Sequence, residues 1–134
     1  MKLIICLDDK YGISFFGKRQ SMDKAVCKDI LAISEGNKLW MKEYSAKLFS
    51  QLGGKLCIEE DYFLKAGAGE YCFAETDDIT AYAQNAEQII VYKWNRIYPS
   101  DLRLPAELLD SRERVEAVEF TGSSHDKITR VVYQ

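Results

Sequence analysis

The sequence is poor in the residues that build several common kinds of functional site. It has a single histidine, His125, and four cysteines, none of which form a C-x-x-C pair. Zinc hydrolases need a cluster of imidazole ligands and structural zinc sites need paired cysteines, so we expect no metal site. The cysteines are widely spaced and lie in apolar stretches, which predicts reduced thiols in the core.

Long apolar runs and a strong excess of one charge are missing as well. The longest apolar runs, residues 3–7 and 88–92, are far too short to span a bilayer. The first residues lead straight into a strand-like segment instead of a signal-peptide core. A net charge of −3 gives phosphate backbones no general attraction. We therefore expect a cytoplasmic protein that binds neither membranes nor nucleic acids.

What the sequence does contain is the pattern of one α/β domain over residues 1–134. Apolar residues make up 47% of the chain, which is enough for a single core. Short apolar segments predict strands at residues 2–7, 38–42, 55–59, 70–74 and 88–94. Capping residues and apolar spacing predict helices that begin at Ser21, near Tyr44 and at Thr76, and a short helix or loop over 106–110.

The end of the chain has a different pattern. Two β-rich runs, residues 114–120 and 127–133, flank a polar turn and predict an antiparallel hairpin. The earlier alternation of strands and helices favours parallel pairing. We predict a three-layer α/β fold, with a mainly parallel central sheet, helices on both faces and a C-terminal antiparallel hairpin.

Several segments, in this order, carry a resemblance to a known family. Residues 3–9 read Leu-Ile-Ile-Cys-Leu-Asp-Asp, with Gly12 after them, and residues 20–23 read Gln-Ser-Met-Asp. Residues 93–98 read Lys-Trp-Asn-Arg-Ile-Tyr. Together they resemble the dihydrofolate reductase fold over nearly the whole chain. The sequence also resembles a group of short bacterial proteins.

The resemblance implies positions for an active-site acid and for cofactor phosphates. Asp23 matches the family's active-site carboxylate, and Ser45 matches one position of its phosphate-holding turn. Glu43 stands where that turn is basic, and Lys93 and Trp94 replace two glycines that approach the dinucleotide pyrophosphate. Bulky and acidic side chains there oppose phosphate binding. We therefore expect no cofactor, with NADPH held through different contacts as the alternative.

Three acids offer candidate chemistry beside the first strand. Asp8, Asp9 and Asp23 could converge at its carboxyl end, where ligands bind in open α/β sheets. One of them, with Asp23 as the candidate catalytic residue, would donate a proton if burial raised its pKa. The alternative is that Asp8 and Asp9 form a turn while Asp23 stabilises a helix N-terminus, and this is the more common situation.

Basic and aromatic residues give two further candidate ligand contacts. Lys18 and Arg19 precede a predicted helix N-terminus, where they could hold a small anion or simply form a solvated turn. Trp40, Trp94 and Tyr98 lie near predicted strand ends, where they could stack on a planar ligand or complete the core.

The lone histidine lies in the polar turn of the predicted hairpin. The run Ser123-Ser124-His125-Asp126 contains the residue types of a nucleophilic triad. Neighbours in one turn do not generally aim at one another as a triad requires, so we interpret His125 as a polar turn residue.

These observations lead to three functional hypotheses. The favoured one is a small-ligand-binding or regulatory protein on a reductase-like scaffold, whose partner is an unidentified small molecule or anion. The second is an atypical NAD(P)H-dependent reductase that uses Asp23 as its acid. The third is an assembly subunit, such as a homodimer, that pairs through an exposed edge of the C-terminal hairpin.

Overall fold

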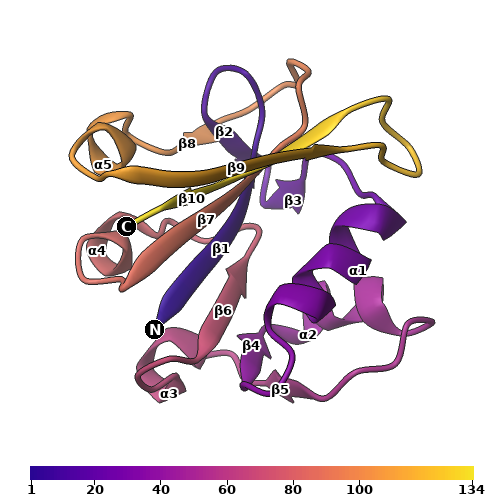
Figure 1. The fold of residues 1–134 in the computed structure, drawn as a ribbon, viewed down its shortest axis with the longest axis vertical. Helices are drawn as coiled ribbons and strands as arrows, with labels where there is room; N and C mark the ends of the chain where they lie inside the picture. Colours follow the sequence, from indigo (N-terminus) through magenta and orange to yellow (C-terminus); the bar gives the residue numbers. More distant parts are fainter.

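A computed structural model describes all 134 residues of the chain. Its main element is a seven-stranded sheet in which five strands run parallel and the C-terminal hairpin is antiparallel (Figure 1). In sheet order the strands are β5 (Leu56–Ile58), β4 (Leu39–Met41), β6 (Tyr71–Ala74), β1 (Lys2–Leu7), β7 (Gln88–Lys93), β10 (Ile128–Tyr133) and β9 (Arg114–Phe120).

Helices cover both faces of this sheet, which confirms the predicted three layers. One face packs on α1 (Lys24–Ile33), α2 (Glu43–Ala46) and the 3-10 helix η1 (Lys47–Phe49). The other packs on α3 (Tyr62–Lys65), α4 (Thr80–Ala83) and α5 (Glu107–Asp110).

Strand β1 is central because its side chains are apolar on both faces. Leu3, Ile5 and Leu7 join the core beneath α3, α4 and α5, and Ile4 joins the core beneath α1. All four are at most 1% exposed. Burial of a side chain of this kind contributes about 1.5 to 3 kcal/mol, so β1 anchors both cores.

A second, smaller sheet was not expected from the sequence. It has the order β3 (Lys18–Arg19), β2 (Gly12–Phe15) and β8 (Leu102–Arg103). The turn between β2 and β3 has two residues with positive φ, Phe16 at 48° and Gly17 at 70°. Such turns match the twist of a two-residue hairpin, but asparagine or aspartate is the usual first residue, and phenylalanine gave no signal.

Helix α1 starts later than its predicted cap at Ser21. Asp23 is the N-cap: its backbone is extended and its carboxylate accepts a hydrogen bond from the Ala25 N–H at 2.8 Å. Met22, which the helical spacing places on the buried face, precedes the helix and is 55% exposed. An aspartate cap satisfies a free N–H group of the first turn as well as a serine cap does.

The remaining predicted elements are present with small shifts at their ends. The antiparallel hairpin is confirmed, as is the short helix near residue 107. All four cysteines are unpaired, and burial raises the pKa of Cys27 to about 11 and that of Cys72 to about 12. None of the helices is both long and apolar enough to cross a bilayer.

Candidate functional site

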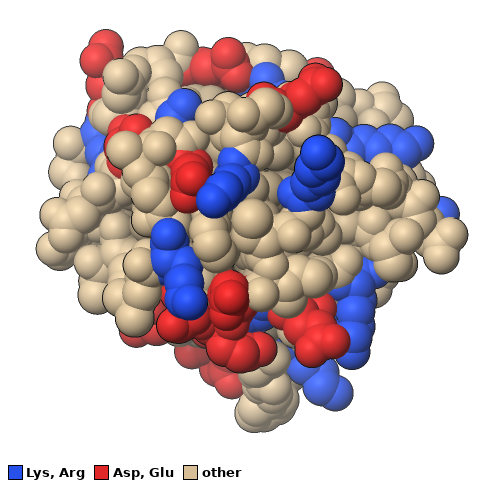
Figure 2. All heavy atoms as spheres, turned by 90° about the horizontal axis from the view of Figure 1, so that it is seen from below, with Lys and Arg blue, Asp and Glu red and all other residues tan.

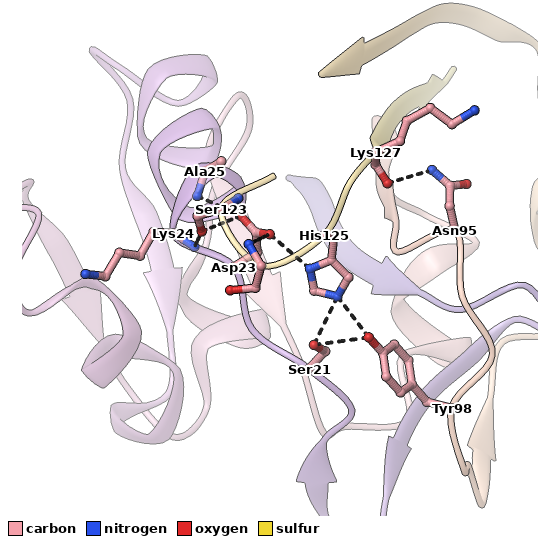
Figure 3. Close-up of polar contacts among 10 residues, drawn as sticks. Ser21, Asp23, Lys24, Ala25, Asn95, Tyr98, Ser123, His125 and Lys127 are labelled. Atoms are coloured by element: carbon pink, nitrogen blue, oxygen red, sulfur yellow. Dashed lines mark hydrogen bonds and ion pairs between the residues drawn. The ribbon is translucent and has the colours of Figure 1, made fainter. Parts of the chain in front are cut away.

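Four side chains that are distant in sequence meet where the β9–β10 turn reaches the start of α1 (Figure 3). Asp23 comes from the cap of α1, Ser21 from the segment before it, Tyr98 from the chain after β7, and His125 from the β9–β10 turn. We call this set the Asp23–His125 cluster. It joins three segments that the sequence separates by up to about a hundred residues.

Asp23 is the best-satisfied polar group of the cluster. Its side chain has no exposed surface. It accepts five hydrogen bonds, from the backbone N–H groups of Ala25, Ser123 and Ser124, the Ser123 hydroxyl and His125 Nδ1, at 2.8 to 3.0 Å. The carboxylate therefore ties the helix cap to the hairpin turn.

These bonds decide the protonation state of the acid. Burial by itself would raise the pKa of Asp23, but the hydrogen bonds from Ser123, Ser124 and His125 lower it well below its usual value. The Asp23 carboxyl is thus ionised at neutral pH. The expectation that burial makes Asp23 a proton donor does not fit this environment.

Glycine at position 122 is required by the close approach of the turn to the carboxylate. A Cβ on Gly122 would collide with an Asp23 carboxylate oxygen and would lie 2.7 Å from the backbone oxygen of His125. The turn can wrap over Asp23 only because this side chain is missing.

His125 is held in one orientation by its neighbours. Its side chain is 2% exposed, and Nδ1 lies 2.9 Å from Asp23 Oδ2. Because a carboxylate can only accept, Nδ1 carries a proton toward Asp23, and in that tautomer of the neutral ring Nε2 is the acceptor. Nε2 lies 3.1 Å from Ser21 Oγ and 2.9 Å from the Tyr98 hydroxyl. Trp94 stacks on the ring, with 4.7 Å between centroids.

His125 lies in the β9–β10 turn as predicted, but its side chain is buried and bonded to residues of other elements, which the interpretation as a polar turn residue did not include. The argument against a triad among its neighbours still holds, since Asp126 makes no contact with the imidazole. Its partners lie in other elements, and a single sequence carries no signal for contacts across about a hundred residues.

Asp8 and Asp9 do not join Asp23. The buried Asp8 carboxylate accepts hydrogen bonds from the Lys10, Gly12 and Tyr98 N–H groups and from the Gln20 side chain. Burial would raise the pKa of Asp8, but these bonds lower it. Asp9 is exposed in the turn after β1. The turn interpretation fits both residues.

Arg19 is already paired with a carboxylate. Its guanidinium donates to both oxygens of Glu75, at 2.9 and 3.0 Å, and lies over the Tyr44 ring at 4.1 Å. The N-terminus of α1 is likewise taken by Asp23. The predicted anion patch is therefore reduced to Lys18, which is exposed.

The predicted set of three aromatic residues is divided between two places. Trp94 and Tyr98 both contact His125. Trp40 packs against the opposite core, and its Nε1 donates to Glu70 Oε1 at 3.0 Å. Ser45 is buried within α2 and lies outside the Asp23–His125 cluster. Of the three aromatic residues, Tyr98 alone lines the cleft at the β2–β3 hairpin, while Trp94 is buried against His125.

A cleft opens beside Tyr98, at the tip of the β2–β3 hairpin. It has a volume of about 340 Å³ and is lined by Phe15, Phe16, Lys18, Arg19, Gln20, Tyr98 and Pro99. A separate cavity of about 10 Å³, room for about one water molecule, shares Arg19 and Gln20 with the cleft and is also lined by Ser21. A larger hollow, of about 1000 Å³, lies at the far end of α1 beside Leu31 and Leu52. No group of three metal-binding side chains is present.

The sequence resemblance implies two places for the phosphates of a dinucleotide, at residues 43–45 and at residues 93–94. Helix α2 has a single turn that begins with Glu43, so its N-terminus offers a negative charge to a phosphate. After β7 the chain carries the buried Trp94 side chain and turns at Asn95, with φ of 58°, and no helix follows until α5. The acidic side chain at the first place and the buried indole at the second both oppose the approach of a phosphate.

The layers and the strand order define an open, mainly parallel α/β fold with an antiparallel margin. The fold is that of dihydrofolate reductase. The solved structure of dihydrofolate reductase from Enterococcus faecalis, complexed with NADP(H) and RAB-propyl, superposes with a TM-score of 0.67 at 11% sequence identity. The match covers 99% of this chain and 94% of that one. No family model and no curated protein sequence matches the chain.

Proposed function

We propose that this chain is a cytoplasmic small-ligand-binding protein. It has the reductase fold, but other residues stand where the resemblance places the contacts to dinucleotide phosphates. Its ligand would occupy the cleft between the tip of the β2–β3 hairpin and Tyr98. The unpaired cysteines support a reducing compartment. A cleft of about 340 Å³ lies within the usual range of small-molecule sites.

The observation that carries this proposal is the conformation of Phe16. Its side chain is 76% exposed at the rim of the cleft, and its φ is 48°. A residue of this kind in the left-handed region costs about 1 to 3 kcal/mol. Asp101 holds it there by accepting from the Phe16 N–H at 3.1 Å. Strain kept at a cleft rim indicates a binding role.

The cleft residues indicate the chemistry of the ligand. The rings of Phe15 and Phe16 lie against each other, tilted by 45° with 4.2 Å between their centroids, and offer an apolar surface to a flat ring. Lys18 is the cation of the cleft that no carboxylate neutralises, since Arg19 is paired with Glu75. The buried Gln20 Oε1 accepts no hydrogen bond. We infer a planar aromatic anion that carries at least one N–H or O–H donor.

The proposal is tested by titrating the protein with 8-anilinonaphthalene-1-sulfonate, a flat aromatic anion, and following dye fluorescence. We expect saturable binding at one site. Phe16→Ala should weaken it about tenfold, because the ring covers apolar surface worth about 1 to 2 kcal/mol. Lys18→Glu should weaken it by a smaller factor.

Matched control variants are Leu64→Ala and Lys28→Glu, which change an exposed apolar and an exposed basic residue away from the cleft. Both should bind the dye as the unmodified chain does. If Phe16→Ala and Lys18→Glu bind it equally well, the cleft is not the site. NADPH, titrated in the same way, should bind without saturation below millimolar concentration. Saturation at micromolar concentration would instead favour an atypical reductase.

A second candidate function, self-association, is favoured by strand β9. Six of its seven residues are exposed, so it is covered on neither face and ends the sheet with a free edge. Long free edges of this kind pair with other strands unless charge or proline blocks them. We propose that two copies pair antiparallel about Ala117, which places Glu116 opposite Val118 and Glu119 opposite Val115 and brings no like charges directly together.

Sedimentation tests this pairing. We expect a dimer that Ala117→Lys converts to a monomer, because that change puts two lysines opposite each other at the two-fold axis. Lys28→Glu, on α1, is the control and should remain dimeric. A monomer at high concentration would remove the proposal. The face in Figure 2 carries basic and acidic side chains side by side.

A further inference from the structure

We propose that Ser21, His125 and Asp23 form a nucleophilic triad that hydrolyses small esters whose acyl group enters the cleft beside Tyr98. This inference rests on the proposed ligand cleft, because Gln20 and Tyr98 line that cleft and Ser21 follows Gln20, with its Oγ 3.4 Å from the Tyr98 hydroxyl. The evidence for it is two successive hydrogen-bond distances. Asp23 Oδ2 lies 2.9 Å from His125 Nδ1, and His125 Nε2 lies 3.1 Å from Ser21 Oγ.

The geometry assigns each residue a separate role. Asp23 is a positioning residue: it is ionised, fully buried, and fixes the tautomer in which His125 Nε2 is the free acceptor. His125 is the general base, and its ring cannot turn because Trp94 stacks on it. Ser21 is the nucleophile. It is partly exposed, while both of its partners are buried.

The site also offers hydrogen-bond donors to a developing oxyanion. The backbone N–H groups of Ser21 and Met22 donate to no acceptor in the protein. In acyl transfer, free N–H groups next to the nucleophile stabilise the charge that forms on the carbonyl oxygen. The segment before α1 thus carries both the attacking oxygen and these donors.

The reaction balances with water as the co-reactant. Ser21 Oγ attacks the ester carbonyl as its proton passes to His125 Nε2. The intermediate then collapses, the bond to the alkoxide breaks, and the alkoxide leaves with that proton as an alcohol. Water attacks the acyl-serine and gives a proton to Nε2, and Ser21 takes the proton back as the carboxylic acid leaves.

Tyr98 regulates the nucleophile by competing for the same nitrogen. Its hydroxyl lies 2.9 Å from His125 Nε2 and 3.4 Å from Ser21 Oγ. The single lone pair of Nε2 accepts one proton at a time, so Ser21 is activated only while Tyr98 donates elsewhere. Tyr98→Phe should therefore speed the attack by Ser21.

The test is covalent labelling with diisopropyl fluorophosphate, followed by intact mass and peptide mapping. Ser21 Oγ displaces fluoride, and we expect one adduct per chain, on Ser21. Ser21→Ala should abolish the adduct, and His125→Ala should slow its formation at least about a hundredfold. Ser124→Ala, which removes an exposed serine of the same turn, is the control and should label normally.

Several outcomes would overturn the triad. An adduct on Tyr98 would overturn it. The absence of any adduct on a chain that circular dichroism shows to be folded would also overturn it. If His125→Ala does not fold, Ser21→Ala and Tyr98→Phe still decide the matter, because the triad requires loss of labelling in one and faster labelling in the other. Dye binding without a Ser21 adduct would refute the triad and leave the ligand cleft standing. An adduct without dye binding would refute the cleft alone.

Discussion

The two parts of the C-terminal hairpin differ sharply in how they are held. At the turn, Asp23 and His125 are buried, and the Asp23 carboxylate accepts five hydrogen bonds. On the outer strand β9, six of seven residues are exposed, and β10 is its only strand partner. The turn of the hairpin is held to α1 by buried hydrogen bonds, whereas most side chains of β9 face solvent.

This difference shows where the hairpin gains its stability. Strand β10 lies between β7 and β9, and Ile128 and Val131 are completely buried. The turn adds the link to α1. Strand β9 contributes pairing to β10 and an Arg130 to Glu116 ion pair at 2.9 Å, and exposed pairs of this kind add little. The hairpin should therefore tolerate changes in β9 and resist changes at the turn.

Asp23→Ala should have the largest effect on the free energy of unfolding. It removes the α1 cap and leaves the donors of His125, Ser123 and Ser124 without an acceptor. Loss of one buried partner of this kind costs about 3 to 5 kcal/mol. Urea denaturation measures it. A loss under about 1 kcal/mol would mean that the turn is not the anchor, and the contrast with β9 would fail.

The same carboxylate should make the stability depend on acid. The pKa of Asp23 is lower in the folded chain than its unfolded value of about 4. The unfolded chain therefore binds more protons below that pH, so the stabilisation is complete above about pH 4 and falls as the pH drops toward the folded pKa. Urea midpoints from pH 6 to 2.5 should decline less steeply for Asp23→Asn. Identical slopes would show that Asp23 has no lowered pKa.

The sequence was sufficient for the parts of the fold that are set by local pattern. Strand β1 is apolar on both faces and could only be central, and residues 114–133 show the alternation and the polar turn of a hairpin. The β2–β3 hairpin was missed because its turn uses phenylalanine at a positive φ, against the usual preference.

The site was harder to predict than the fold. Asp23 and Tyr98 were identified through the family resemblance, but their meeting point was not, because His125 reaches them from the other end of the chain. Arg19 was expected to be free, and its partner Glu75 lies 56 residues away. Side-chain pairing at such separation depends on tertiary structure, which local spacing does not encode.

Gly122→Ala tests how closely the turn is packed. The new methyl group would meet the Asp23 carboxylate, so either the turn or the cap must move. Overpacking of this kind costs about 1 to 3 kcal/mol. Gly67→Ala is the control for the loss of a glycine, since its φ is not positive and a Cβ there meets no atom closer than 3.5 Å. If Gly122→Ala is no more damaging than Gly67→Ala, the close approach is not a constraint.

The smallest change in the free energy of unfolding is expected in β9. It can be measured by comparing one substitution at Val118 on β9 with the same substitution at Val131 on β10. Val118→Thr adds a hydroxyl at a position that is 38% exposed, where water can solvate it, and should change the free energy of unfolding by under about 0.5 kcal/mol. Val131→Thr makes the same change on β10 at a completely buried site and should cost about 1 to 3 kcal/mol, because the hydroxyl loses its water. Measured below the concentration at which β9 edges pair, equal costs would mean that β9 is covered in solution. The contrast between an exposed β9 and a buried β10 would then fail.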